Sequence, residues 1–377
     1  MRADSARVHG TWYAGEESGF IQRIIVSEFI VQKGYYNVES VPIAMKYETE
    51  SRAQSNGTDS RISTSESFDV VIVGGGPAGS AVGVFTARYG LDTLIFDRGN
   101  SSLQRCAFLE NYLGFPGGID IETFYELIHD HATEMGCKLR SEFVEEVDQL
   151  DSGRFKITTQ DDDIVEADRV VAATRYKSEY LRELNDEGEM FETRDRGGKQ
   201  RNNFDCKYPD EDGRTPTDGL YVASPAEDVE IQVLSSAGHG SRVARTVIED
   251  VRREHGFPDG ISDYNDWMRR LGHGRDKESM RDKLRGKINR DLPDDVDEES
   301  LVEIRDSEVD RRLDRYLSQD KIEHRTERGH DRLLEHIDDD RILAAAHEIK
   351  SERRTDSDRQ GETSERDETT GDHASNI

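Results

Sequence analysis

The chain has 377 residues and carries 80 acidic against 51 basic side chains, which gives a net charge of −29. No basic patch is visible to offset phosphate repulsion, so the composition argues against nucleic acid as a partner. Lysine is scarce and arginine supplies most of the positive charge. This haloarchaeal-type composition resembles that of proteins from salt-in halophiles, in which high ionic strength screens self-repulsion.

The N-terminal segment differs in composition from the rest of the chain. Residues 1–66 end in a polar linker, and we expect them to lie outside the folded core, with Met45 as the native start. A small accessory β-segment is the alternative. The apolar stretch 20–31 is too short and too charged to span a bilayer, and no signal-peptide pattern is present. We therefore expect a cytoplasmic protein without a membrane partner.

The segment 68–97 predicts a strand, a glycine turn, a helix, a second strand and a final acidic residue. Gly74, Gly76 and Gly79 fit the pattern G-x-G-x-x-G. The first suits a tight turn, the second lets backbone approach a pyrophosphate, and the third allows close packing of helix and strand. The helix N-terminus would face the phosphates, and Asp97 would accept hydrogen bonds from a ribose. The segment therefore predicts a dinucleotide site.

The following residues predict an α/β domain over 67–257, with a parallel sheet and a β-meander insertion. Beyond this domain the apolar content is thin. We expect a charged helical extension over 258–350, with helices around 309–317 and 333–343, and a disordered tail over 351–377. Expected strands lie at 141–150, 154–159, 163–166, 168–174 and 220–223, and expected helices follow residue 120 and cover 233–253.

Four segments, in the right order, resemble the thioredoxin reductase-like group of FAD-dependent pyridine nucleotide oxidoreductases. The resemblance covers roughly half of the chain and implies a Rossmann-like FAD-binding domain. In that family the last segment places a helix N-terminus against the pyrimidine side of the flavin, which suits the negative charge that develops on reduction. The four segments are the glycine motif with Asp97, the loop 110–118, the turn 172–174, and 219–223 with Gln232 and 237–240.

Three departures from the family pattern stand out. Only about 44 residues separate Thr174 from Gly219, too few for the family's nicotinamide domain. The chain has no C-x-x-C, because its three cysteines, Cys106, Cys137 and Cys206, are scattered. The family's GD aspartate and the glycine of its ATG turn are also replaced, by Pro225 and Arg175 respectively. A true thioredoxin reductase is therefore not expected.

The residues that carry the chemistry are less clearly marked than those of the cofactor site. Cys106 could exchange electrons with a flavin, with simple packing as the alternative. His239 could donate a proton to reduced flavin, with capping of the helix as the alternative. His129 and His131 point to different faces of one helix, so no metal site is expected. The expected cofactor-binding residues are Gly74, Gly76, Pro77, Ala78, Gly79, Asp97, Asn111, Thr174, Gln232 and Gly238.

The preferred interpretation is an FAD-dependent oxidoreductase that transfers hydride or electrons to an unknown acceptor. NAD(P)H would dock transiently as reductant, and the partner would be a small molecule or an electron-transfer protein; a homodimer is left open. The alternative is a non-catalytic or degenerate FAD scaffold or sensor. Aromatic-ring hydroxylases also begin with GGGPAG, but their later GD-containing motif is missing here.

Overall fold

The computed structural model describes residues 66–99, 101–175, 177–185, 188–195, 200–226, 232–266, 268–272, 274, 276–292 and 298–369. The predicted start at Met45 lies outside these ranges. The description below therefore concerns the α/β domain and the helical extension.

A seven-stranded sheet forms the centre of the α/β domain. The strand order is β5-β2-β1-β8-β7-β6, and β11 pairs with β8 as a seventh strand. The pairs around β1, together with β2–β5 and β8–β11, are parallel, whereas β6, β7 and β8 form the predicted antiparallel meander. The strands are β1 (Glu66–Val73), β2 (Thr93–Phe96), β5 (Lys138–Arg140), β6 (Val144–Gln149), β7 (Phe155–Thr159), β8 (Ile164–Ala172) and β11 (Leu220–Val222).

Strand β8 corrects one sequence-based prediction. The segments 163–166 and 168–174 were expected to form two strands, but they form the single strand β8. The first half of β8 lies between β7 and β1. The second half lies between β11 and β1. One strand can serve both the meander and the parallel sheet because its burial changes from alternating to continuous at Arg169.

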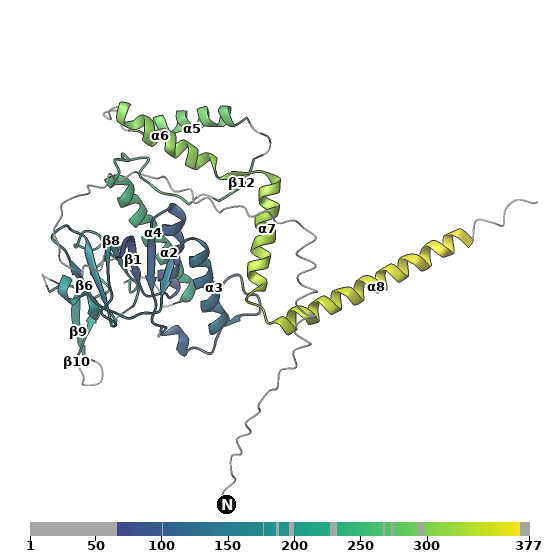
Figure 1. Cartoon of the computed structure of the whole chain (residues 1–377), viewed down its shortest axis with the longest axis horizontal. Coiled ribbons are helices and arrows are strands. Elements are labelled where there is room, and N and C mark those ends of the chain that lie inside the picture. The colour runs from purple at the N-terminus through teal and green to yellow at the C-terminus, as the bar shows by residue number, and fades with distance from the viewer. Residues whose placement is uncertain are drawn as a thin grey trace, which may run out of the picture. The chain divides into compact units, whose positions relative to one another are not determined.

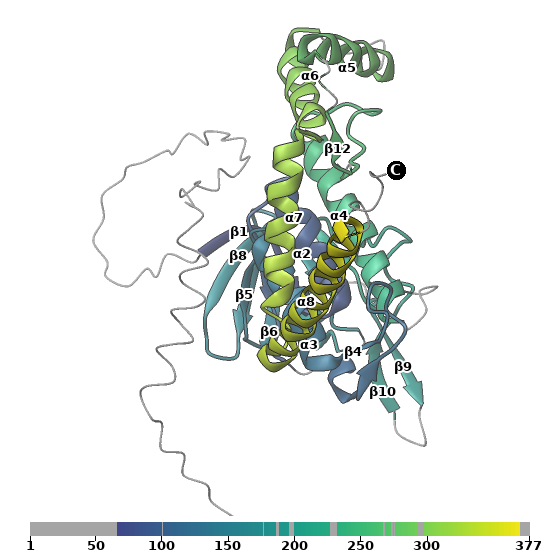
Figure 2. The same ribbon diagram turned by 90° about the vertical axis from the view of Figure 1, so that its right-hand side faces the viewer.

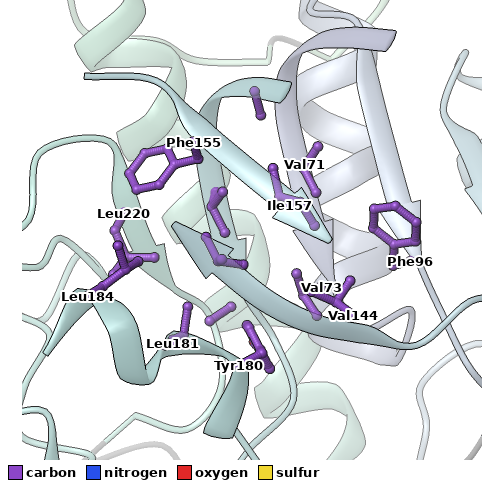
Figure 3. Close-up of a cluster of buried hydrophobic side chains, with 14 of the residues drawn as sticks. Val71, Val73, Phe96, Val144, Phe155, Ile157, Tyr180, Leu181, Leu184 and Leu220 are labelled. Atoms are coloured by element: carbon purple, nitrogen blue, oxygen red, sulfur yellow. The ribbon is translucent and has the colours of Figure 1, made fainter. Parts of the chain in front are cut away.

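The two faces of β1 are covered by different layers. Val70 and Ile72 pack against the helices, whereas Val71 and Val73 pack against the meander, which explains why the whole run is apolar. Figure 1 shows the three helices on the first face. Figure 3 shows the second cluster, which includes Phe155 and Ile157 of β7 together with Leu181 and Leu184. The covering elements are α2 (Pro77–Tyr89), α3 (Ile121–Glu134), α4 (Val233–Glu254) and the short helix η2 (Glu179–Leu184).

Smaller elements connect the main ones. A two-stranded ribbon follows Asp97, and a polar antiparallel hairpin follows η2 in the stretch between Thr174 and Gly219. The ribbon is β3 (Phe108–Leu109) with β4 (Ile119–Asp120), preceded by η1 (Leu103–Arg105), and the hairpin is β9 (Phe191–Asp195) with β10 (Gln200–Phe204).

The extension is helical, as expected, but its boundaries differ from the predicted ones. The helix predicted around 309–317 ends at Leu313, because 316–317 pair with 270–271 as a short parallel ribbon. The helix predicted around 333–343 is broken, because Asp338 accepts a hydrogen bond from the Arg341 N–H and starts a new helix. The elements are β12 (Arg270–Leu271), α5 (Lys277–Asp291), α6 (Glu298–Leu313), β13 (Tyr316–Leu317), α7 (Gln319–Leu334) and α8 (Asp339–Thr369).

The tail predicted to be disordered from residue 351 is helical as far as Thr369, since α8 runs through it. Glutamate and arginine supply eight of the nineteen residues from 351 to 369, and both are good helix formers, so a polar composition does not exclude a helix. Figure 2 shows α7 and α8 as successive helices. Within the described ranges, no helix is both long enough and apolar enough to cross a bilayer.

Helix α7 is joined to α3 by ion pairs. Arg332 binds Asp130, Arg328 binds Glu134, and the His336 Nε2 lies 3.2 Å from an Asp130 oxygen. The extension therefore contacts α3, the helix that also packs against the glycine turn after β1.

Candidate functional site

The glycine turn after β1 has the geometry that its pattern predicts. Gly74 has a φ of +112°, which side-chain-bearing residues rarely adopt, and its N–H donates to the Phe96 carbonyl at 2.8 Å. A Cβ on Gly79 would overlap the Gly74 carbonyl oxygen, so the helix can pack this closely only on glycine. A Cβ on Gly76 would instead meet a single atom, the Tyr125 Oη at 3.9 Å. Open space therefore lies in front of Gly76.

The N-terminus of α2 faces that space without a side-chain cap. Gly76 is the N-cap residue, Pro77 follows at the first helical position, and no side-chain hydrogen bond caps this end within the described residues. The N–H groups of the first turn, including that of Ala78, have no partner inside the helix. An uncapped N-terminus with open space in front of it can accept an anionic group such as a phosphate.

Asp97 stands beside this turn at the end of β2. Its Oδ1 accepts from the Gly99 N–H at 3.1 Å, and its Oδ2 lies 3.3 Å from the His129 Nε2. Burial by itself raises the pKa of Asp97, but the hydrogen bonds from His129 and Gly99 lower it overall. A cavity of about 630 Å³ opens next to it, lined also by Tyr125 and His129. An ionised carboxylate at this cavity can accept hydrogen bonds from ribose hydroxyl groups.

The loop 110–118 and the start of α4 lie together. The Asn111 Nδ2 donates to the Gln232 Oε1 at 3.0 Å, and Gln232 is the N-cap residue of α4. Val233 packs against the apolar cluster that includes Phe124. The structure therefore joins two predicted site residues that are 121 positions apart.

The turn after β8 adjoins the glycine turn. A Cβ on Gly74 would lie 2.7 Å from the Ala173 carbonyl oxygen, and the Thr174 hydroxyl bonds to that of Tyr180 at 3.0 Å. Arg175, which replaces the family's glycine, keeps a φ of +60°. That conformation costs a non-glycine residue roughly 1–2 kcal/mol. The Arg175 guanidinium donates to the Ser102 hydroxyl at 2.7 Å, so the side chain gains a contact with the loop after Asp97.

The cysteines differ in exposure and none is bonded to another. Cys106 is exposed and follows η1. Cys137 is buried against α2, and burial raises the pKa of its thiol to about 12. A thiol with that pKa is unreactive near neutral pH, which agrees with a packing role for Cys137.

His239 lies inside α4 rather than at its end. Gln232 is the N-cap residue, so the expected capping role of His239 is wrong. Burial and the nearby Arg242 lower the pKa of His239, and its Nε2 has no hydrogen-bond partner among the described residues. Gly238 precedes it in the same turn, with open space where a Cβ would stand.

Sequence analysis did not identify Tyr125 and His129 as site residues. Both lie on α3, whose position against the glycine turn results from packing between segments about fifty residues apart. The only available signal was the amphipathic pattern of the helix, which says that one face is buried but not what it meets. No group of three or more histidine, cysteine or acidic side chains suited to a metal occurs among the residues described by the structure.

Comparisons with known proteins find similarity to one group of oxidoreductases within the α/β domain. Residues 68–204 match the family model of the pyridine nucleotide-disulphide oxidoreductases. A thioredoxin reductase of Rickettsia prowazekii is 32% identical over 114 residues, which are 30% of this chain and 36% of that protein. The thioredoxin reductase of Bacillus subtilis is 32% identical over 92 residues, which are 24% of this chain and 28% of that protein. The chain thus spans about a third of the length of the curated relatives it matches.

Solved structures similar to this one include two thioredoxin reductases. That of Gloeobacter violaceus is 18% identical, with a TM-score of 0.42, and the alignment covers 53% of this chain and 98% of the other. That of T. acidophilum is 19% identical, with a TM-score of 0.39, and the alignment covers 50% of this chain and 99% of the other.

Proposed function

We propose, from the premise that the α/β domain is thioredoxin reductase-like, that the protein binds FAD and acts as a flavin-dependent oxidoreductase. The observation that carries this proposal is the pairing of two features at one edge of the sheet. Gly76 faces open space at the uncapped end of α2, and the ionised Asp97 faces a cavity next to it. Together they offer donors for a pyrophosphate and an acceptor for a ribose.

The residues present fit the cofactor at both of its ends. The backbone from Gly76 to Gly79 would hold the pyrophosphate, and Asp97 the ribose of the adenosine half. The Asn111–Gln232 contact and the N-terminus of α4 would border the flavin half. FAD, when bound, supplies reversible one- and two-electron chemistry. The positive end of the α4 dipole would favour negative charge on the bound flavin.

We assign the source and the acceptor of the electrons from the residues that the chain contains. The described residues between Thr174 and Gly219 form η2 and the β9–β10 hairpin, and the sequence holds no C-x-x-C. We therefore assign NAD(P)H as a reductant that docks transiently, and an acceptor other than thioredoxin. The protein would then differ in reaction from the thioredoxin reductases that it resembles.

A non-catalytic flavoprotein is the second candidate, and two residues favour it. Pro225 occupies the place of the family's aspartate, and Arg175 stands at a glycine position in a left-handed conformation. Such a protein would hold FAD without turning over reduced nicotinamide.

The test is the absorbance spectrum of the full chain, purified in high salt and supplied with FAD. A flavin spectrum that bleaches on addition of NADH or NADPH supports the enzyme, and one that does not bleach supports the scaffold. A protein that takes up no FAD contradicts both.

The position of the cofactor is tested by Gly76→Leu, which should abolish flavin retention because a side chain fills the open space. Gly286→Leu on α5, where a Cβ meets nothing within 4 Å, is the matched control and should retain flavin. Flavin retention by Gly76→Leu would show that the pyrophosphate lies elsewhere.

A further inference from the structure

His129 makes two contacts that converge on the glycine turn. Its Nε2 lies 2.8 Å from the Gly75 carbonyl oxygen and 3.3 Å from the Asp97 Oδ2. A carbonyl and a carboxylate are acceptors only, so the Nε2 must carry a hydrogen, whether or not the ring is charged. His129 therefore donates to the backbone of the turn and to the acid at the same time.

The turn brings two acceptors together, one of which, the Gly75 carbonyl, also accepts a hydrogen bond from the Ser80 hydroxyl at 3.0 Å. Gly75 has no side chain, and a Cβ there would lie 2.6 Å from the Cβ of Asp97. This close approach places the Gly75 carbonyl and the Asp97 carboxylate within reach of one nitrogen. Two acceptor oxygens that face the same point repel each other unless a hydrogen lies between them. The imidazole supplies that hydrogen and sets the direction of the carboxylate.

The imidazole is itself held in place by α3. Asp120 caps the helix by accepting from the Thr123 N–H at 2.9 Å. The ring of Tyr125 packs edge-on against that of His129, with centroids 5.5 Å apart, and the Tyr125 hydroxyl is hydrogen-bonded to Ser101. The His129 side chain is 22% exposed and lines the cavity next to Asp97. The ring is therefore restrained on one side and open to a ligand on the other.

We infer that His129 is a positioning residue of the dinucleotide site, which holds Asp97 against the glycine turn and makes dinucleotide affinity depend on pH. This inference rests on the proposed function, because it assigns a role within the same site. A charged imidazolium beside the phosphates and ribose would strengthen binding of the anionic dinucleotide. Deprotonation of the ring would weaken binding, but the neutral ring would keep its hydrogen bond to Asp97.

The sign of the pH dependence follows from the surroundings of the ring. Burial lowers the pKa of His129, but the hydrogen bonds to Asp97 and to the Gly75 carbonyl raise it overall. The ring thus stays charged to a higher pH than an ordinary histidine, and dinucleotide affinity should fall as pH rises through that raised pKa. The other ionisable groups around the ring are Asp97 and Arg98 after β2, Cys106, Asp120, Glu122, Tyr125 and Glu126, with His336 3.8 Å from Glu126.

Of the groups in direct contact with the ring, Asp97 has a lowered pKa and Tyr125 a raised one, so neither is expected to change charge near neutral pH. A variant that lacks only the His129 imidazole therefore separates its effect from that of His336.

The experiment measures the Kd of FAD, with ADP as a second probe, for the full-length apoprotein between about pH 5.5 and 9 at constant salt. Wild type should lose affinity by about twofold to tenfold across this range. His129→Gln, which keeps a donor but cannot titrate, should bind with intermediate affinity and no pH dependence. His129→Ala should bind most weakly. His131→Gln, on the exposed face of the same helix, is the matched control and should keep the wild-type profile.

Each outcome decides between the proposals. A wild-type pH profile retained by His129→Gln, or wild-type affinity in His129→Ala, overturns the role of His129 while FAD binding stands. Wild-type protein that binds neither FAD nor ADP at any pH overturns the proposed function, and the inference with it.

Discussion

The α/β domain and the helical extension are stabilised in different ways. In the domain, the strands at the centre of the sheet are apolar on both faces, and Val70, Val71 and Ile72 have no exposed surface. In the extension, the corresponding cluster is small: it contains Phe257, Ile261, Ile288 and Val309. Next to this small cluster lies a buried group of charges. The comparison shows that a strongly acidic chain can extend its fold with ion pairs where apolar residues are few.

The buried charges centre on Glu308 of α6. Its side chain has no exposed surface and accepts hydrogen bonds from Arg252, Arg311 and Arg312. Arg252 belongs to α4 and also donates to the carbonyls of Ser262 and, at 2.5 Å, Ile261. One carboxylate thus joins α6 of the extension to α4 of the α/β domain.

The largest expected effect comes from removing that carboxylate. Glu308→Ala leaves the Arg252 guanidinium buried without its acidic partner, which should destabilise the packing of α6 on α4 by about 3–5 kcal/mol. Urea unfolding followed by circular dichroism measures the loss, and FAD uptake should be unchanged. Glu303→Ala, an exposed acid on the same helix, is the control and should change little. Equal losses in the two variants would contradict the central role of Glu308.

The second largest effect on stability is expected when the pH is lowered. Burial raises the pKa of Glu308, but the neighbouring arginines lower it from 4.5 to about 2 overall. Because the folded protein binds this proton more weakly than the unfolded chain, the stabilisation is complete above pH 4.5 and is lost as pH falls towards about 2. The loss should be about 3 kcal/mol. Helical circular dichroism against pH measures it, and the difference between wild type and Glu308→Gln should disappear at the acid end.

The smallest effect is expected at the exposed ion pairs between α7 and α3. Arg332 binds Asp130 and is 34% exposed. Arg332→Gln should cost less than about 1 kcal/mol, because solvent and salt screen such pairs. Thermal unfolding at low and high salt measures this, and the difference from wild type should shrink in high salt. A loss as large as that in Glu308→Ala would mean that this ion pair and the buried one at Glu308 do not differ in kind.

The local geometry of the proposed dinucleotide site could be predicted from sequence. Gly74, Gly76, Gly79 and Asp97 lie within one strand–turn–helix–strand unit, so their spacing alone determines which conformations and contacts they need. The geometry of the turn agrees with that prediction, and the contact between Asn111 and Gln232 agrees with the order of the resemblance.

The remaining part depends on packing between distant segments. His129 was recognised only as half of an unlikely metal pair, because its distance from Gly75 follows from how α3 rests on the turn. The pairing of 316–317 with 270–271 was missed for the same reason, since a helical spacing of apolar residues does not reveal a competing strand partner. The periodicity of a sequence indicates that one face of an element is buried. The element that packs against that face is known only from the folded structure.

Helices α2 and α4 touch at their backbones, since a Cβ on Gly240 would overlap the carbonyl oxygen of Ala78. Side chains at a contact can rotate and give way, but two backbones in contact cannot. The N-termini of α2 and α4, which the proposed cofactor would contact, are therefore held at a fixed distance from each other. This fixed distance would select a dinucleotide by its length, because a dinucleotide can reach both N-termini. A mononucleotide can reach only one of them, so its binding would not depend on that distance.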